Sequence, residues 1–215
     1  MNYRAAAGLI PLCMIMSVSA LFAQSPGSEW LLIDDFARSQ SAVGTEWEGF
    51  TDRVMGGRSE MSVTVVPDGD DRVLRMRGRV SLENNGGFIQ VRVPLADRGA
   101  FDAREYEGVA VELRVRNAGS YYVHMRTAQN LAPWTYFAQQ IPSTLAADSR
   151  DDGRQDDDQH NDGRLIVQLP FEGFESELMF GSPRPNLRRV RSLALVAASD
   201  NFEADIELSR IWLYR

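Results

Sequence analysis

The sequence predicts an all-β protein, a β-sandwich of the jelly-roll kind, on the basis of three observations. Apolar and polar residues alternate with period two through nearly every segment that looks ordered, as in GVAVELRVRN at residues 108–117. Such alternation is typical of antiparallel strands with one face in a core and the other toward solvent. Clusters of Gly, Pro, Asn and Asp separate these segments. No segment carries a helical apolar stripe over three turns, and no repeat recurs at a fixed period, which argues against helical folds, propellers and solenoids.

The predicted strands follow one another along most of the chain. In GGFIQVRVPL, Ile89, Val91 and Val93 share one face, while Gln90 and Arg92 share the other. The same alternation predicts further strands, in chain order, at residues 62–66, 73–80, 109–116, 122–126, 135–141, 165–169, 192–198 and 205–214. With no helices between them to cross over, these strands favour a sandwich of antiparallel sheets.

The first 23 residues have the features of a secretory signal peptide. Arg4 is their only charge, an apolar run extends over residues 5–22, and small residues lie near Ala23. Pro11 breaks this run, which barely reaches the length that a membrane-spanning helix needs, so cleavage after Ala23 is favoured over a retained anchor. We expect residues 24–215 to form a single domain that is periplasmic or secreted, with no stable membrane insertion after cleavage.

The composition argues against several classes of function. All 23 basic residues are arginine and 30 residues are acidic, which gives a net charge of −7 and disfavours nucleic acids and anionic membranes as partners. The single cysteine, Cys13, would leave with the signal peptide, so neither a disulfide nor a thiolate site is expected. The chain has two histidines, His124 and His160, and no Gly-x-Ser-x-Gly elbow. We therefore expect no catalytic residues and no cofactor, although a pair of carboxylates such as Glu83 and Glu112 leaves a glycosidase open.

An acidic segment, residues 142–163, differs from the rest of the chain. Between Asp148 and Asp162 it holds seven aspartates and two arginines. The spacing of its acidic residues loosely resembles a calcium loop, but it does not match a twelve-residue loop that ends in Glu. We expect a solvated, mobile insertion between two strands and no metal site.

The polar face of the predicted sheet is the best candidate for a binding site. If neighbouring segments pair as strands, their outward residues form a ladder of planar polar groups over which two aromatic rings could stand. Such a face is suited to a sugar or a peptide, although cross-strand charge pairs on a solvated face are an equally good reading. The candidate ligand- or partner-binding residues are Gln90, Arg92, Glu112, Arg114, His124, Arg126, Trp134 and Tyr136.

Several motifs resemble, in order, those of the complex I intermediate-associated protein family, over residues 30–214. They are TDRVMGGRSE, GRVSLENNGGFIQVRV, HMRT followed by PWTYF, VQLPFEGF and DNFEADIELSRIWLY. The family's signature falls on Asp52, Val54, Met55, Gly56, Gly57, Ser59, Ser81, Asn84, Asn85, Gly86, Gly87, Phe88 and Arg92.

The resemblance implies a galactose-binding-like jelly roll, a β-sandwich also found in carbohydrate-binding modules. The better-known members of the family are mitochondrial chaperones that hold assembly intermediates of respiratory complex I. An exported protein cannot readily reach the matrix-side arm of that complex. We therefore expect a non-enzymatic binding module, an assembly or chaperone-like factor with an unidentified protein partner, or alternatively a module that binds a glycan.

The glycine pairs in the two signature motifs are expected to make turns. In VMGGRS, Gly56 and Gly57 would adopt positive φ and swing the chain into the following strand. In ENNGGF, Asn84 and Asn85 are turn formers that tolerate the left-handed region, which the two glycines after them would extend. Close approach of a ligand to these glycines is the alternative.

Overall fold

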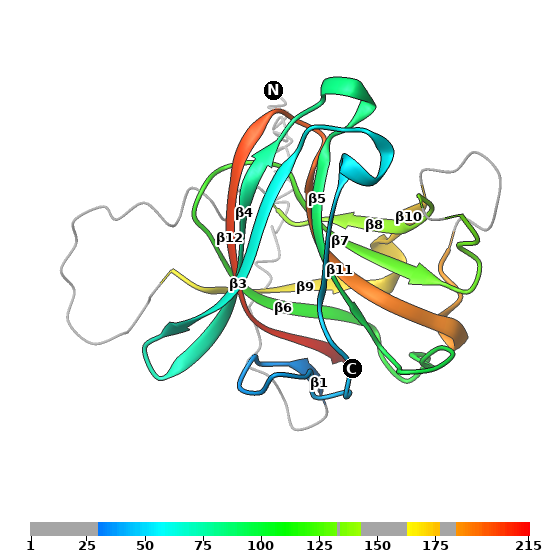
Figure 1. Ribbon diagram of the computed structural model, residues 1–215. Coiled ribbons are helices and arrows are strands. Elements are labelled where there is room, and N and C mark those ends of the chain that lie inside the picture. Colours follow the sequence, from blue (N-terminus) through cyan, green and yellow to red (C-terminus); the bar gives the residue numbers. More distant parts are fainter. Residues whose placement is uncertain (1–29, 133, 143–162, 177–183) are drawn as a thin grey trace, which may run out of the picture.

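A computed structural model describes residues 30–132, 134–142, 163–176 and 184–215 of the protein, and it confirms the all-β prediction. Two antiparallel sheets of six strands each form the two layers of a sandwich (Figure 1). The helices of the described residues are four short 3-10 turns, none of them long and apolar enough to cross a membrane: η1 (Asp52–Met55), η2 (Glu83–Asn85), η3 (Phe171–Gly173) and η4 (Leu187–Arg189). The predicted signal peptide, residues 1–23, and residues 143–162 of the acidic segment lie outside the described residues, so the predictions for them stay predictions.

The first sheet, called sheet A, is built around the long strand β12 (Phe202–Tyr214). One side of β12 pairs with β6 along most of its length, while the other side pairs first with β4 and then with β1. This change of partner lets thirteen residues of one strand span the whole layer. The other strands of sheet A are β1 (Leu31–Asp34), β3 (Glu60–Asp68), β4 (Asp71–Val80), β6 (Gly108–Val115) and β9 (Leu165–Pro170).

The second sheet, called sheet B, has the strand order β10-β8-β7-β11-β5-β2. The three middle strands, β7, β11 and β5, each have a hydrogen-bonded neighbour on both sides, so their backbone groups are used within the sheet. The strands of sheet B are β2 (Glu48–Thr51), β5 (Phe88–Pro94), β7 (Tyr121–Thr127), β8 (Phe137–Gln140), β10 (Glu175–Ser176) and β11 (Val190–Ala198).

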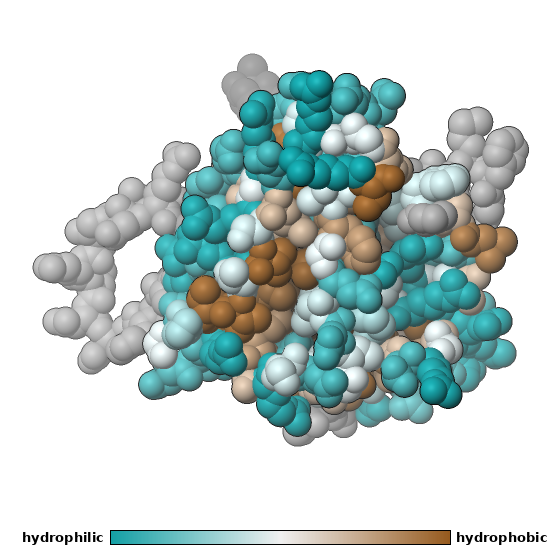
Figure 2. All heavy atoms as spheres, viewed as in Figure 1, coloured by the Kyte–Doolittle hydropathy of each residue, from teal (hydrophilic) through white to brown (hydrophobic). Residues whose placement is uncertain are grey.

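The core lies between the two sheets and contains the inward residues that the alternation predicts. Ile89, Val91 and Val93 of β5 are all buried, and they belong to one apolar cluster with Leu74 and Met76 of β4 in the facing sheet. Burial of each such side chain contributes about 1.5–3 kcal/mol. The outward residues are left to the two outer faces, and the surface in view is mostly hydrophilic, with a few hydrophobic patches (Figure 2).

Three strands were not predicted: β1, β2 and β10. The first has the sequence LLID with no alternation, the second contains Gly49, and the third has only two residues. Gly49 has a packing role, because a Cβ there would lie 2.8 Å from Cε of Met61 across the sandwich. Strands this short or interrupted are specified by their neighbours in the sheet rather than by their own pattern.

Candidate functional site

A cleft of about 680 Å³ lies on the outer face of sheet B. Its floor comes from β5, β7 and β11, and its rim comes from β2, η1, η2 and the segment before β8. The described residues that line it are Phe50, Val54, Met55, Leu82, Asn85, Gly86, Gly87, Phe88, Gln90, Arg92, His124, Arg126, Trp134, Tyr136, Ser192, Ala194, Ala198 and Ser199.

The shape of the floor follows from the register of the three middle strands. Arg92 of β5, Ala194 of β11 and His124 of β7 lie side by side in one row across the sheet. Because outward residues of the central strand β11 such as Ser192 and Ala194 are small, the larger side chains of β5 and β7 stand on either side of a trough. Alternation along each strand keeps this trough separate from the core.

His124 provides a hydrogen-bonding group that the protein itself does not use. Its side chain is 9% exposed, and its ring stacks on that of Tyr136 with centroids 3.9 Å apart and planes inclined by 14°. Neither ring nitrogen has a hydrogen-bond partner among the described residues. Burial lowers the pKa of His124 to about 3, so the imidazole is neutral at physiological pH. A neutral imidazole carries one donor and one acceptor, which suits a hydroxyl group.

Two arginines lie beside His124 in the cleft. Nη2 of Arg126 donates to the carbonyl oxygens of Ala132 at 2.9 Å and Asn130 at 3.3 Å. Burial lowers the pKa of Arg126, and the nearby Arg92 and Arg191 lower it further.

Arg92 is held more firmly. Its Nη2 donates to Oε2 of Glu48 at 2.6 Å, and its guanidinium lies 4.6 Å from the centre of the Phe50 ring. The two guanidinium groups are therefore held on opposite sides of the trough, Arg92 on β5 and Arg126 on β7, where they can meet a ligand in a defined orientation.

The rim of the cleft gathers exposed apolar side chains. Trp134 is 65% exposed, and Val54, Met55 and Leu82 are 73, 54 and 45% exposed. Of the six large apolar side chains that are exposed among the described residues, these four line the cleft. Exposed apolar groups collected around a hollow mark a binding surface rather than scattered surface residues.

Asp52 joins the two rim turns η1 and η2. The side chain is fully buried, and its carboxylate accepts hydrogen bonds from the amide and hydroxyl of Ser59 at 2.9 and 2.5 Å and from the amides of Gly87 at 2.6 Å and Phe88 at 3.4 Å. Burial alone would raise the pKa of Asp52, but these hydrogen bonds outweigh it and hold the pKa below its ordinary value. Ser59 in turn accepts from the amide of Ser81 at 3.0 Å. The signature residues thus form one polar anchor behind the rim.

The two glycine pairs lie beside this polar anchor, and the prediction that they adopt positive φ is only partly right. Gly56 has φ +89°, and Asn84 and Asn85 both have φ 57°, as expected. Gly87 also has positive φ, at +127°. Gly57 and Gly86 do not, so positive φ is wrong for them.

Gly57 and Gly86 are required because Asp52 packs against them. A Cβ on Gly57 would lie 2.3 Å from Cγ of Asp52, and one on Gly86 would lie 2.4 Å from its Oδ2. Close approach is therefore the reason for these two glycines, but to a buried carboxylate of the protein itself rather than to a ligand.

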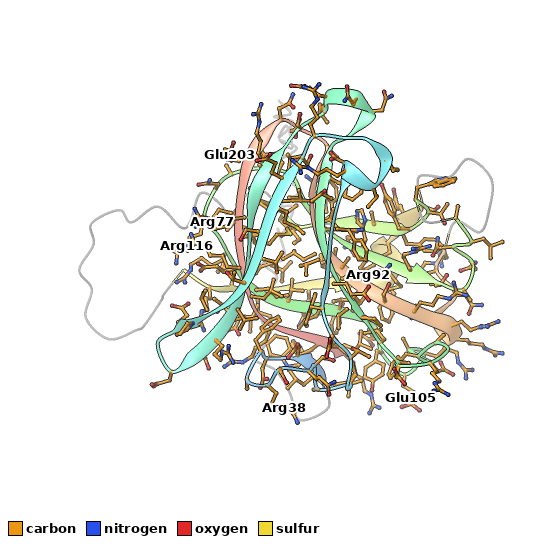
Figure 3. The ribbon with its side chains drawn as sticks, viewed as in Figure 1. Arg38, Arg77, Arg92, Glu105, Arg116 and Glu203 are labelled. Carbon is orange, nitrogen blue, oxygen red and sulfur yellow. The ribbon has the colours of Figure 1, made fainter. Side chains whose placement is uncertain are left out.

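The structure brings together six of the eight candidate binding residues: Gln90, Arg92, His124, Arg126, Trp134 and Tyr136. Glu112 and Arg114 were assigned to this face wrongly, because β6 lies in sheet A. There Glu112 accepts from Arg210 at 2.9 Å, and Arg114 pairs with Glu207 at 2.6 Å and Asp68 at 2.7 Å. Figure 3 shows Arg77 of β4 and Arg116, the residue after β6, on the side of the molecule away from Arg92. This face is a structural network of ion pairs.

Sequence reasoning missed Phe50, Leu82 and the small residues of β11 as parts of the cleft. Six residues of the rim were identified only as signature residues: Val54, Met55, Asn85, Gly86, Gly87 and Phe88. The exposed apolar pair Val54 and Met55, set in a polar turn, is the one local signal that could have placed this segment at a site. No group of potential metal ligands occurs within the part of the chain that the structure describes.

Comparisons with known proteins agree with this architecture. The family model for complex I intermediate-associated protein 30 (CIA30) matches residues 35–208. Among solved structures, the family 11 carbohydrate-binding module of the cellulosomal cellulase Lic26A-Cel5E of Clostridium thermocellum superposes with a TM-score of 0.59 at 12% identity, covering 89% of this chain and 96% of the module. A family 11 module from the same organism, in complex with a β-1,3-1,4-mixed-linked tetrasaccharide, gives a TM-score of 0.57 at 11% identity, covering 88% and 97%. These likenesses establish a shared jelly-roll fold. No curated protein matches the chain.

Proposed function

This chain belongs to the complex I intermediate-associated protein 30 family, and we propose that it is a non-enzymatic binding protein that holds a glycan in the cleft on sheet B. The observation that carries this proposal is the pairing of planar polar groups with aromatic rings around one trough. Sugars present hydroxyl groups at their edges and apolar C–H groups on their ring faces, and the cleft offers a partner for each.

Unused hydrogen-bonding groups support this reading. The amide of Gln90 and the imidazole of His124 have no hydrogen-bond partner among the described residues, and both line the trough. Because both groups line the open cleft, the hydroxyl groups of a ligand can replace the water there and form hydrogen bonds with them. Trp134, exposed above them, is available to cover a sugar ring.

The known ligand of a structural relative is compatible with the proposal. The family 11 module solved with a mixed-linked tetrasaccharide shares the jelly-roll fold of this chain. At 11% identity the likeness extends to the fold and not to the ligand. The proposal therefore depends on the residues of this cleft.

Isothermal titration calorimetry with neutral and acidic oligosaccharides tests the proposal. We expect at least one oligosaccharide to bind, and Trp134→Ala and Gln90→Ala to weaken it about tenfold or more, which corresponds to ~1.4 kcal/mol. Leu131→Ala is the matched control, because Leu131 is 87% exposed and does not line the cleft. Melting curves should stay in place for all three variants. If no oligosaccharide binds, or if Trp134→Ala binds as the wild type does, the glycan function is wrong.

A second candidate, an assembly factor that binds a protein, is favoured by one specific observation. Val54, Met55 and Leu82 form an exposed aliphatic rim, and aliphatic groups do not stack on sugar rings. The family's name also points to association with assembly intermediates. A protein that co-purifies with the wild type, is lost with Val54→Ser and Met55→Ser, and is kept by Gln90→Ala would favour this candidate over the glycan.

A further inference from the structure

We propose that the glycan is acidic, and that a carboxylate of a uronic-acid unit is received in the cleft by the guanidinium of Arg126. The inference rests on the proposed function and specifies the chemical class of its ligand. It follows from the charge of the cleft, from the contacts of Arg126 and from the position of the cleft on the sheet.

The charge of the cleft is opposite to that of the protein. The chain carries a net charge of −7, yet the described residues that line the cleft include two arginines and no aspartate or glutamate. Glu48 neutralises one of them through its 2.6 Å contact with Arg92. A third arginine, Arg191, is close enough to Arg126 to disfavour its charged form. The hollow is therefore a local site of positive charge on an acidic molecule.

Arg126 is the arginine without a counter-ion. Within the described residues it forms no ion pair, and its Nη2 donates only to two backbone carbonyl oxygens. Arginines of the outer face of sheet A behave differently: Arg75 and Arg210, for example, are paired with carboxylates at 2.6–3.0 Å. A partly buried cation without a counter-ion is unfavourable, because desolvation is not offset by an opposite charge. A bound carboxylate would supply that charge and accept a charge-assisted hydrogen bond from Nη1 or Nε, because Nη2 already donates to the two carbonyl oxygens.

The fold favours an acidic sugar over an acidic peptide. The strands of the floor, β5, β7 and β11, each pair on both sides, so an extended peptide cannot add to them as a further strand. The groups beside Arg126 are a neutral imidazole, an amide and an exposed indole, which suit hydroxyl groups and a sugar ring. A uronic-acid unit carries a carboxylate, hydroxyl groups and an apolar ring face on one ring.

Calorimetry with matched pairs of oligosaccharides tests this inference. The probes are oligomers of galacturonate, mannuronate and glucuronate, each beside its carboxyl-reduced, uncharged counterpart. We expect the wild type to bind at least one acidic oligomer tenfold or more tightly than its reduced counterpart, and added NaCl to weaken only the acidic one. Arg126→Gln should abolish the preference, Arg126→Lys should keep part of it, and Arg104→Gln, an exposed arginine paired with Asp102 outside the cleft, should leave it unchanged.

The outcomes separate the two proposals. Equal binding of acidic and reduced oligomers would overturn the acidic ligand and leave the glycan function in place. A preference for acid that survives Arg126→Gln would overturn the role of Arg126. Binding of no sugar at all would overturn both proposals. Both would also be overturned if the protein bound an oligoglutamate peptide instead of a sugar and lost that binding with Arg126→Gln. Even if the Arg126 variants prove unstable, the salt dependence of oligosaccharide binding by the wild type decides whether the ligand is acidic.

Discussion

At the scale of single residues, Asp52 shows how the protein stabilises the rim of its cleft. A buried carboxylate is unfavourable unless its oxygens are satisfied, and here four hydrogen bonds from two separate segments satisfy them. Gly57 and Gly86 must lack side chains because the carboxyl group occupies the space where their Cβ atoms would lie. The rim is thus positioned before a ligand arrives, which reduces the entropy lost on binding.

The packing of Asp52 against Gly57 predicts that substitutions at Gly56 and Gly57 lower the free energy of unfolding by different amounts. Gly57→Ala should lower the free energy of unfolding by about 3 kcal/mol, because its Cβ would overlap Asp52. Gly56→Ala should lower it by only about 1 kcal/mol, since that position has positive φ but no atom within 4 Å of the new Cβ. Urea denaturation measures both. A larger effect at Gly56 than at Gly57 would contradict the close packing against Asp52.

His124 predicts a specific pH dependence of stability. Burial lowers its pKa from 6.5 to about 3, so between these values the unfolded chain binds more protons than the folded one. The contribution of neutral His124 is complete above about pH 6.5 and is lost as the pH falls toward 3, with about 2 kcal/mol lost by pH 5. His124→Gln should remove this loss. Its free energy of unfolding should therefore fall less between pH 7 and pH 5 than that of the wild type, and equal slopes would show that His124 is not buried as described.

At the scale of elements, the two outer faces of the sandwich differ in use. On sheet A, Glu207 of β12 is 3% exposed and accepts from Arg114 and Arg116. Such networks on a sheet satisfy each charge within the face itself. On sheet B, Gln90, His124 and Arg126 of β5 and β7 have no charged partner within the part of the chain that the structure describes. One face stabilises the fold and the other is available to a ligand.

The network on sheet A predicts a large effect of one substitution. Glu207→Ala should lower the free energy of unfolding by about 2–3 kcal/mol, because it removes a nearly buried carboxylate that accepts from Arg114 and Arg116, although Arg114 keeps its pair with Asp68. Glu60→Ala, which removes an exposed pair with Arg53, should change it by less than about 1 kcal/mol. Thermal and urea unfolding measure both. Similar small effects in the two variants would mean that the buried network contributes no more than a surface pair.

The same elements show what the sequence could and could not reveal. Alternation correctly placed Arg92 and Arg126 on outward faces, because period two is a property of each strand alone. It could not assign Arg114 to a sheet, because β6 and β7 follow one another in the chain but belong to different sheets. The rim was missed for a similar reason: η1 and η2 lie far apart in sequence and are brought together by long-range contacts such as those of Asp52 with Gly87 and of Asn84 with Gly56. Strand character is local, while sheet membership and clefts depend on long-range pairing.

At the scale of the whole molecule, the predicted signal peptide makes the cellular location testable. The apolar run after Arg4 and the small residues near Ala23 predict removal of residues 1–23 on export. Mass spectrometry of the protein recovered from the periplasm or the medium should therefore give an N-terminus at Gln24. An intact Met1 in that fraction, or recovery only in the membrane fraction, would contradict cleavage.

Along β11, neighbouring residues face opposite sides of the sheet, so the core and the cleft are built from different side chains. Leu193 and Leu195 face the core, whereas Ser192 and Ala194, their immediate neighbours, face the cleft. The outward side chains of β5, β7 and β11 can therefore be replaced in evolution while the inward side chains, which determine folding, stay the same. Two chains that differ at nearly nine positions in ten can share this fold, as the 12% identity beside a TM-score of 0.59 illustrates. In this sandwich, the residues that determine folding and the residues that line the cleft are therefore separate sets that can change independently.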